Sequence, residues 1–426
     1  MLTYKEQKNV ARWFCEAEIA WLQDQTTDSE SLQALRSALD SQPATDRWRR
    51  RLESFDRLIA QRRRPTRDDE YVRHWGYGGI RLFETASGRQ IYQISIRSFP
   101  GHDTHCYYLH GVEPVLIDIG SGLPSNGADW NARGHVLDAV YGIDETMRSL
   151  RHLVISHGHV DHYGFLPRLL ELARPTIYCH ELDARVLEQF DERIVLAGLD
   201  LKRYLLHAGV PADETHALIE LFSEGREYFS NCAVDIRLRD GSVIPGGGEV
   251  IHVPGHCAGL ICIRFDDLLF TADHVLQDVT PHQAPQALNP FFGLEHYFAS
   301  LHKIADLTGI RLALPSHGPL IHDLRSRVQD ILYFHQRRLG QVLEMFAEPR
   351  TVAEIAQELF GDLSGYNVIL GIEEAGAHVE YLHQHGWLRV VNVESLRTGD
   401  TTIARYVQDP EAMKYRKEPT VRGRSS

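Results

Sequence analysis

The run His157-Gly158-His159-Val160-Asp161-His162 constrains the fold and the chemistry of this 426-residue chain more than any other feature. It places three imidazoles and one carboxylate in a tight loop directly after the short apolar stretch Leu153-Val154-Ile155. Such a loop cannot aim all four side chains at one ion, but it can divide them between two adjacent ions. Imidazole together with carboxylate suits zinc, iron or manganese rather than calcium. The run therefore predicts a metal centre at the end of a buried strand.

Three later segments share one design, in which an apolar stretch ends in a histidine or an aspartate beside small residues. They are Val253-Pro254-Gly255-His256, Phe270-Thr271-Ala272-Asp273 and Leu314-Pro315-Ser316-His317-Gly318. A rigid strand that delivers a ligand at its end is what a metal site requires. Each segment is a weak signal when taken alone. In this order after the first run, the three segments reinforce one another and predict that His256, Asp273 and His317 complete a two-metal centre.

The pattern of apolar residues in the middle of the chain predicts strands that alternate with helices. Short apolar or alternating stretches predict strands at 91–96, 115–117, 153–155, 249–253, 260–265, 268–271 and 312–314. Apolar residues at three- and four-residue steps predict helices at 165–172 and over most of 178–230. Strands followed by helices imply a sheet that helices cover, which is an α/β layer architecture.

The two ends of the chain differ from the middle. The pattern of apolar residues within 1–70 predicts a helical extension that ends in a charged, proline-containing linker. Residues 325–426 predict a long helix at 325–346, then a helix opened by the capping box Thr351-Val352-Ala353-Glu354. A second helix is expected at 372–385, with Gly386 at its end, before strands at 387–391 and 402–407. This order predicts a winged helix, and the polar tail after Asp409 is expected to fray.

The metal-binding segments resemble the metallo-β-lactamase superfamily from about Ile80 to Asp323. The resemblance includes an aspartate after a strand (Asp118), the His-x-His-x-Asp-His run, and the later histidine, aspartate and histidine. It implies an α+β fold, the four-layer αββα sandwich, in a catalytic domain at 71–324. The implied ligands are His157, His159 and His256 for the first metal, Asp161, His162 and His317 for the second, and Asp273 as the bridge, with Asp118 as a structural brace.

Further residues narrow the resemblance to one branch of the superfamily. Two segments resemble those of enzymes such as lactamase-beta-like 2 and glyoxalase II, namely Asp273-His274-Val275-Leu276 and the later Thr280-Pro281-His282. These enzymes belong to a branch that has a C-terminal winged helix. Two positions depart from the usual pattern. Cys257 stands where threonine or serine usually follows the histidine, and Ala272 stands where glycine often precedes the aspartate. Both departures leave the ligands intact but alter the residues around them, and so bear on metal preference.

The chemistry that the resemblance implies is hydrolysis of an acyl bond. Two metals about 3.5–4 Å apart lower the pKa of a shared water and hold it as hydroxide, which is predicted to attack a small ester, thioester or lactone. Asp161 is the predicted catalytic carboxylate, which orients this nucleophile or accepts its proton. The expected cofactors are two divalent ions, zinc first, with iron and manganese as alternatives. Contact with the substrate is predicted for Tyr163, His274, Phe291, Phe292 and Tyr297. An equally weighted alternative is that these residues are aromatic side chains of the core or of an interface.

Two other reactions stay open on the sequence. A ribonuclease-like phosphodiesterase needs a basic path to the metals, yet the formal net charge is −13 and the helix at 372–385 carries Glu373, Glu374 and Glu380. Nucleic acid is therefore not the expected partner. An iron-dependent reaction of the persulfide dioxygenase type stays open because ligand identity alone does not exclude it. A non-enzymatic protein would be expected to lack some ligands, and every ligand position of the motif is filled.

The remaining composition predicts a cytoplasmic protein that acts on a small molecule. The six cysteines form no C-x-x-C pair and are expected to be reduced thiols. The first residues have no apolar run behind their charges, unlike a secretory signal. No stretch approaches the ~18 apolar residues that a membrane span needs. The predicted winged helix is expected to serve packing or a homodimer rather than nucleic-acid binding.

Overall fold

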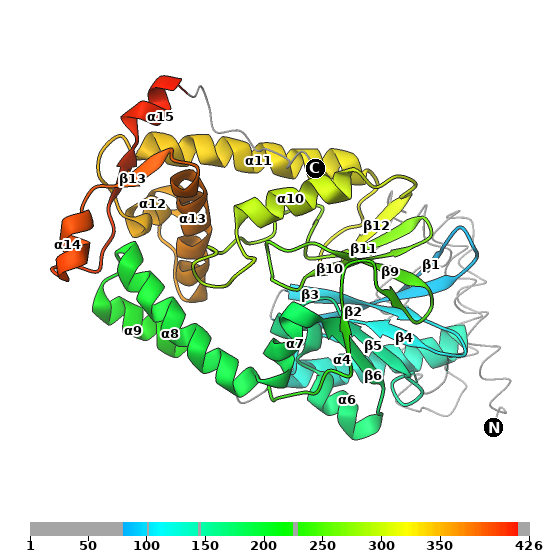
Figure 1. The fold of residues 1–426 in the computed structure, drawn as a ribbon. Helices are drawn as coiled ribbons and strands as arrows, with labels where there is room; N and C mark the ends of the chain where they lie inside the picture. Colours follow the sequence, from blue (N-terminus) through cyan, green and yellow to red (C-terminus); the bar gives the residue numbers. More distant parts are fainter. Residues whose placement is uncertain (1–79, 100–101, 144–145, 225–228, 416–426) are drawn as a thin grey trace, which may run out of the picture. The chain divides into compact units, whose positions relative to one another are not determined.

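Figure 1 shows the computed structural model of the chain, which describes residues 80–99, 102–143, 146–224 and 229–415. The helical extension and the linker predicted for residues 1–70 lie outside the described residues. The chain divides into two compact units. Of the described residues, the first unit contains those at 80–154 and Val160–Thr176, and the second contains Ile155–His159 and those at 177–415. The chain thus passes from the second unit into the first between His159 and Val160.

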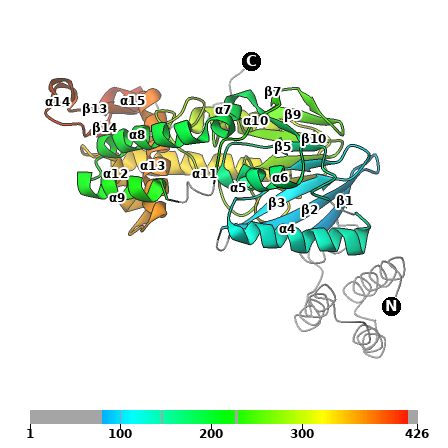
Figure 2. The ribbon, with the colours of Figure 1, turned by 90° about the horizontal axis from the view of Figure 1, so that it is seen from below.

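The first unit is built on an antiparallel meander that ends in a parallel pair. Its strands are β1 (Ile80–Glu84), β2 (Gln90–Phe99), β3 (His102–Leu109) and β4 (Val115–Ile117), which pair antiparallel in this order. β4 then pairs in parallel with β5 (His152–Ile155). The strands predicted at 91–96, 115–117 and 153–155 are therefore confirmed. The predicted alternation in β2 is not observed, because most of its residues are buried and helix α4 packs along it (Figure 2).

The helices of the first unit follow its parallel strands. α4 (Pro124–Val136) continues into the short π-helix η2 (Leu137–Tyr141) after β4. α5 (Val160–Tyr163) and α6 (Leu166–Leu172) come after β5, and α6 confirms the helix predicted at 165–172. α5 is a single turn whose last three residues are buried. It places the second half of the histidine run inside the unit rather than on its surface.

The second unit contains a five-stranded sheet in the order β12-β11-β10-β9-β8. β8 (Val243–Ile244), β9 (Gly248–His252), β10 (Ile261–Phe265) and β11 (Leu268–Ala272) pair antiparallel, whereas β12 (Leu312–Pro315) runs parallel to β11. These elements confirm the strands predicted between residues 249 and 314. A parallel pair, β6 (Thr176–His180) and β7 (Ile236–Leu238), also belongs to this unit. Because β11 and β12 run in parallel, their carboxyl ends lie next to each other, and the residues that follow the two strands leave the sheet at the same place.

Helices make up most of the rest of the second unit (Figure 1). They are α7 (Glu181–Glu188), α8 (Phe190–Ala208), α9 (Ala212–Phe222), α10 (Leu294–Ala305), α11 (Leu324–Met345), α12 (Val352–Phe360) and α13 (Tyr366–Gln384). The predicted capping box is present, since the Thr351 hydroxyl accepts from the Glu354 amide and the Glu354 carboxylate accepts from the Thr351 amide. The helix predicted at 372–385 begins earlier than expected, at Tyr366, directly after Gly365 with its φ of +60°.

The chain after α13 forms a small antiparallel pair and two short helices. β13 (Leu388–Val390) pairs with β14 (Tyr406–Gln408), and α14 (Val393–Thr398) lies in the connection between them. The order of helix, helix and hairpin is therefore present, whereas the assignment as a winged helix stays a prediction. The expectation that the tail frays after Asp409 was wrong for residues 410–415, because Asp409 caps a further helix, α15 (Pro410–Tyr415), by accepting from the Glu411 amide. The rest of this tail, 416–426, lies outside the described residues.

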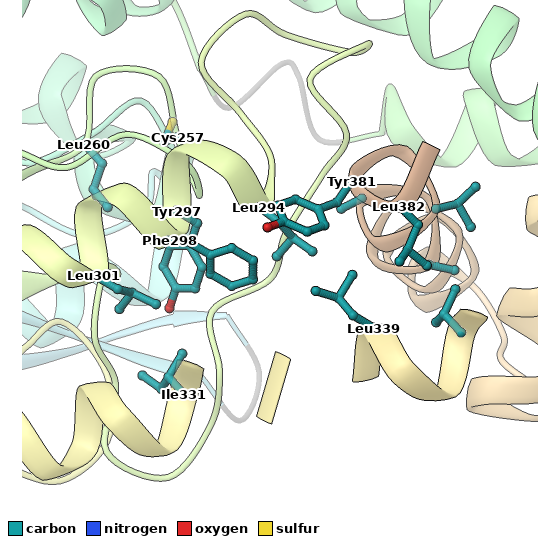
Figure 3. Packing of buried hydrophobic residues seen from close by; sticks show 14 of the residues in the cluster. Cys257, Leu260, Leu294, Tyr297, Phe298, Leu301, Ile331, Leu339, Tyr381 and Leu382 are labelled. Atoms are coloured by element: carbon teal, nitrogen blue, oxygen red, sulfur yellow. The ribbon is translucent and has the colours of Figure 1, made fainter. Parts of the chain in front are cut away.

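A single apolar cluster joins the sheet of the second unit to its C-terminal helices (Figure 3). Tyr297 and Phe298 on α10 are buried in it together with Leu339 on α11 and Tyr381 on α13. The rings of Phe298 and Tyr381 meet edge to face, with centroids 5.4 Å apart. Because burying each large side chain contributes about 1.5–3 kcal/mol, this cluster fixes α13 against α10. Among the described residues, no helix has both the length and the apolar character that crossing a membrane requires.

Candidate metal centre

Four side chains of the second unit bring one ligand atom each to a common point. The ligand atoms of His157, His159, His256 and Asp273 all lie within 4.8 Å of one another. Nδ1 of His159 lies 3.0 Å from Nε2 of His157 and 3.2 Å from Nε2 of His256. The Asp273 Oδ2 atom lies 3.9 Å from Nε2 of His157 and 3.7 Å from Nε2 of His256. The structure thus brings together four residues that the sequence predicts as ligands from three separate segments.

These separations fit a divalent ion in a tetrahedral site. With metal–nitrogen bonds of about 2.0–2.1 Å, the corners of a tetrahedron lie about 3.4 Å apart, and the observed separations run from 3.0 to 3.9 Å. A neutral imidazole donates from only one of its two nitrogens. Three imidazole nitrogens that face one point therefore cannot all form hydrogen bonds with one another. A cation that accepts a lone pair from each of them satisfies all three, so this donor set fits a metal.

Hydrogen bonds on the outer nitrogens determine which nitrogen faces the centre. Nδ1 of His256 lies 2.7 Å from the carbonyl oxygen of His282. A carbonyl only accepts, so Nδ1 carries the proton and the lone pair of Nε2 faces the other ligands. The Ser156 hydroxyl, 3.0 Å from Nδ1 of His157, is placed to accept in the same way. Such outer partners are what orient metal-binding histidines in proteins.

Asp183, near the start of α7, connects the two loops that carry the three histidines. Its carboxylate accepts from the Gly158 amide at 2.8 Å and from the Gly259 amide at 2.7 Å. A Cβ atom at Gly259 would lie 2.6 Å from Cγ of Asp183, so this contact requires glycine. Burial raises the pKa of Asp183, and the two amide donors oppose that rise. The sequence does not reveal this residue, because an aspartate in the first turn of a helix is common.

Cys257 supports the same carboxylate. Its thiol forms a side-chain hydrogen bond with Asp183, and burial raises the pKa of the thiol well above its usual value. The protonated thiol is therefore a donor. Cys257 stands where threonine or serine is usual, and it keeps the donor that a hydroxyl would supply there. This departure from the family pattern leaves the support of the metal centre in place.

A close backbone contact with α10 sets the path of the loop before His256. Gly255 has a φ of +137°, and a Cβ atom there would lie 2.5 Å from Cα of Tyr297. The Ser300 hydroxyl, one turn further along α10, donates to the Pro254 carbonyl at 2.7 Å. Only glycine permits both the backbone conformation and the approach of the helix at this position. The small residue before His256 thus has a specific structural role.

His317 lies on the other side of Asp273. Its Nε2 atom is 3.3 Å from Oδ1 of Asp273, whereas Oδ2 faces the three histidines. The two residues meet because Ala272 and Pro315 are paired at the ends of parallel strands. Ala272 has a φ of +46°, which turns the chain into Asp273. A carboxylate with one oxygen toward the three histidines and the other toward His317 fits the predicted bridging role, which stays a prediction.

In the first unit, Asp118 holds His162 from the strand side. Its Oδ2 atom lies 2.8 Å from Nδ1 of the fully buried His162, which is the bracing position expected of Asp118. The Asp161 Oδ2 atom lies 3.4 Å from Nε2 of His162 and 3.5 Å from Nε2 of His102. His102 was not predicted, since a lone histidine in a strand carries no distinguishing signal. Asp161, His162 and Asp118 thus form one group within this unit.

Most of the residues predicted to contact substrate pack inside the protein. Tyr163, His274 and Tyr297 are fully buried, and the Tyr297 hydroxyl donates to the His274 carbonyl at 3.1 Å. Burial lowers the pKa of His274 to about 3, so its ring is neutral. Phe292 packs partly buried against the apolar cluster, whereas Phe291 is 41% exposed with a φ of +70°. Contact of these residues with substrate stays a prediction.

Comparison with curated proteins identifies relatives of modest similarity. An atrochrysone carboxyl ACP thioesterase of Aspergillus fumigatus is 27% identical over 276 residues, which cover 61% of this chain and 69% of the relative. A lactamase-like protein of Emericella nidulans is 22% identical over 267 residues, which cover 60% of this chain and 67% of the relative.

Solved structures with the same fold cover more of the chain. A metallo-beta-lactamase family protein of Thermus thermophilus gives a TM-score of 0.59 at 22% identity and covers 75% of this chain and 98% of its own. A beta-lactamase domain protein of Burkholderia ambifaria gives a TM-score of 0.58 at 19% identity and covers 78% of this chain and 92% of its own. Residues 100–320 also match the metallo-beta-lactamase superfamily as a family. Because this match spans more than half of the chain, the chain belongs to the metallo-β-lactamase superfamily and has its fold.

Proposed function

We propose that this protein is a metal-dependent hydrolase that cleaves a thioester or a closely related small acyl bond. The convergence of His157, His159, His256 and Asp273 on one point carries the proposal, because this donor set fits a divalent ion. Two relatives, of Aspergillus fumigatus and of a Cryptosporiopsis species, are named atrochrysone carboxyl ACP thioesterases. Their names favour a thioester among the ester, thioester and lactone substrates that the sequence leaves open.

The proposed ligand division keeps two ions. His157, His159 and His256 would hold the first, and Asp273 would lie between the two. For the second ion, the assignment of Asp161, His162 and His317 rests on the sequence motif. When bound, such ions lower the pKa of a coordinated water and polarise a carbonyl oxygen. Zinc is the proposed metal, with iron and manganese as alternatives, because imidazole and carboxylate ligands suit all three.

Asp161 is the residue that we propose accepts the proton of the attacking water. Its carboxylate lies 3.4 Å from Nε2 of His162, whose other nitrogen is held by Asp118. The half-exposed His102 lies 3.5 Å from the same Asp161 oxygen. His102 is therefore placed to take the proton from Asp161 and pass it to solvent. Asp118 would serve only to hold the ring of His162.

The proposal is tested by measuring thiol release from acyl-N-acetylcysteamine and acyl-pantetheine substrates, beside matched oxygen esters, lactones and RNA. We expect thioester turnover that a chelator abolishes and zinc restores, with about two metal ions per chain. His256→Ala should lower turnover by at least about a thousandfold. A decrease of this size corresponds to the loss of about 4 kcal/mol of transition-state stabilisation. His216→Ala, on the exposed face of α9, is the matched control and should leave turnover unchanged.

Three outcomes would contradict the proposal. Full activity of His159→Ala on the identified substrate would show that the ligand assignment is wrong. One iron per chain with consumption of oxygen, and no hydrolysis, would favour the dioxygenase-type reaction instead. Cleavage of RNA without thioester turnover would favour the phosphodiesterase.

A further inference from the structure

The segment 281–287, here called the linking segment, contains the atom that orients the metal ligand His256. The carbonyl oxygen of His282 accepts from Nδ1 of His256 at 2.7 Å and so fixes the tautomer of that ring. The Nε2 atom of His256 is thereby directed toward His159 and Asp273. The linking segment itself forms no helix or strand. Other parts of the protein must therefore hold the orienting carbonyl in place.

Two carboxylates of α13 hold the linking segment by its backbone amides. Glu374 Oε2 accepts from the Gln283 amide at 2.8 Å. Glu380 uses both oxygens, because Oε2 accepts from the Gln286 amide at 2.7 Å and Oε1 from the Ala287 amide at 3.0 Å. Hydrogen bonds of amides to carboxylates are short and about twice as strong as those between neutral groups. Three amides of one irregular segment are thus bound by a single helix.

The ring of His282 and the shape of α13 complete this attachment. Nε2 of His282 donates to the Leu370 carbonyl on α13 at 3.1 Å, so one residue binds the helix with its ring and the metal ligand with its backbone. Gly376 makes room first for the side chain of Tyr204 on α8 and then for Pro285, whose Cγ would lie 3.1 Å from a Cβ atom at Gly376. The missing side chain allows the helix to lie directly against the linking segment.

α13 is in turn fixed to the neighbouring helices. Nδ1 of His378 donates to the Glu374 carbonyl within α13 at 2.7 Å, which leaves Nε2 of His378 to accept from Nδ1 of His335 on α11 at 3.2 Å. Both rings are fully buried. Together with the ring contact between Phe298 and Tyr381, these bonds make α13 a rigid support. A rigid support is what the position of a ligand requires.

We infer that Glu374 and Glu380 on α13 are positioning residues for His256 and thereby set how tightly the centre binds its metal. The inference rests on the proposed metal site and extends it to a helix that supplies none of the ligands. It assigns to the C-terminal helices a role in metal affinity, through the linking segment. The two carboxylates touch neither the metal ligands nor the reacting atoms, so their effect on turnover would follow from the metal.

The test compares four variants with the wild-type chain. Glu374→Ala removes the acceptor for the Gln283 amide, whereas Glu374→Gln keeps one acceptor oxygen in place. Glu380→Gln replaces one of two acceptor oxygens by an amide group that cannot accept. Thr351→Ala removes the cap of α12 without contact to the linking segment, and so controls for a general weakening of the C-terminal helices.

Zinc affinity is measured by competition with a chromophoric chelator, and ligand geometry by the visible spectrum of the cobalt-substituted protein. The melting temperature of the metal-free protein is recorded for each variant. We expect Glu374→Ala and Glu380→Gln to bind zinc about tenfold or more weakly, in the range for changes of outer partners, with an altered cobalt spectrum. Glu374→Gln should remain close to wild type. Thr351→Ala should lower the melting temperature while its zinc affinity and cobalt spectrum stay unchanged.

Wild-type zinc affinity in both Glu374→Ala and Glu380→Gln would overturn the inference. An equal loss of affinity in Thr351→Ala would overturn it as well, because the effect would then be one of general stability. A wild-type chain that binds no zinc, cobalt, iron or manganese would overturn the proposed function itself. The wild-type measurement therefore separates the failure of the proposed function from the failure of this inference.

Discussion

Asp183 connects the two loops that carry His157, His159 and His256. It binds the amide between His157 and His159 and the amide of Gly259, three residues after His256. Neither hydrogen bond involves a metal ligand atom. The carboxylate therefore sets the distance between two ligand loops before any ion binds. Its burial is unfavourable for a charged group, but it is tolerated because both oxygens are hydrogen-bonded.

Replacing Asp183 by asparagine should damage both stability and metal binding. The amide group would face one of the two backbone N–H groups and leave it without an acceptor, which costs about 1–3 kcal/mol when buried. We expect a decrease of about that size in the free energy of unfolding of the metal-free protein, measured with urea, and weaker zinc binding. Asp213→Asn, at an exposed position of α9, is the control. Unchanged zinc affinity in Asp183→Asn would refute this role.

The clustering of His157, His159, His256 and Asp273 could be predicted from the sequence, whereas the residues that hold this cluster could not. His256 and Asp273 each follow an apolar strand, and this pattern is visible within a few residues. Asp183 meets its partners 25 and 76 positions away in the chain, and His282 meets Leu370 88 positions away. A pattern of neighbouring residues carries no information about contacts at such separations. Residues of this kind become apparent only once the strands and helices are placed in space.

At the scale of secondary structure, α13 shows how a correctly predicted helix can be misinterpreted. Its periodicity indicates a helix, and its three glutamates suggest a surface that repels phosphate. The structure instead directs Glu374 and Glu380 to backbone amides of the linking segment. The periodicity of a helix indicates which residues share a face, but not what covers that face. The expectation against nucleic acid therefore rests on the net charge of −13 rather than on this helix.

Glu373 on α13 should make stability depend on pH. Burial raises its pKa to about 8, far above the value of about 4.5 for an exposed glutamate, so the folded protein retains a proton that the unfolded chain releases. Its stabilising effect is present below pH 4.5 and is lost as the pH rises through about 8. Glu374, with a pKa raised to about 7, contributes in the same direction.

The measurement is the urea unfolding of the metal-free protein at pH 6 and at pH 9. We expect the wild-type chain to be less stable at pH 9, and Glu373→Gln to reduce this difference, because glutamine stays neutral at both values. Glu394→Gln, on the exposed helix α14, should keep the wild-type difference. An equal pH dependence in Glu373→Gln and in the wild type would exclude Glu373 as its source.

At the scale of the whole chain, the family and the fold could be predicted because the ligand motif spans many segments in a fixed order. The matched residues 100–320 lie inside the catalytic domain predicted at 71–324. The domain boundaries and the winged helix stay predictions. A single sequence marks where strands and helices begin and end, whereas domains are defined by contacts between distant segments, such as those of α13 with α8, α9 and α11.

Removal of the metal should lower the thermal stability of the whole protein. The four clustered ligands come from three segments, so an ion that binds only the folded state holds them together. A ligand at a thousand times its dissociation constant adds about 4 kcal/mol to stability. We therefore expect chelation to lower the melting temperature measured by calorimetry and added zinc to restore it. Equal melting temperatures with and without chelator would contradict a metal held in the folded protein.

Gly259 and Asp183 are expected to stay unchanged over evolution. A Cβ atom at Gly259 would overlap the side chain of Asp183 and would lie 2.8 Å from its backbone nitrogen, so a smaller side chain at position 183 would not make room for it. A lineage that altered either position would pass through a damaged intermediate. Selection would therefore keep this pair unchanged while the surface around it diverges. Positions that never touch a substrate can in this way limit which new activities descend from an ancestral metal centre.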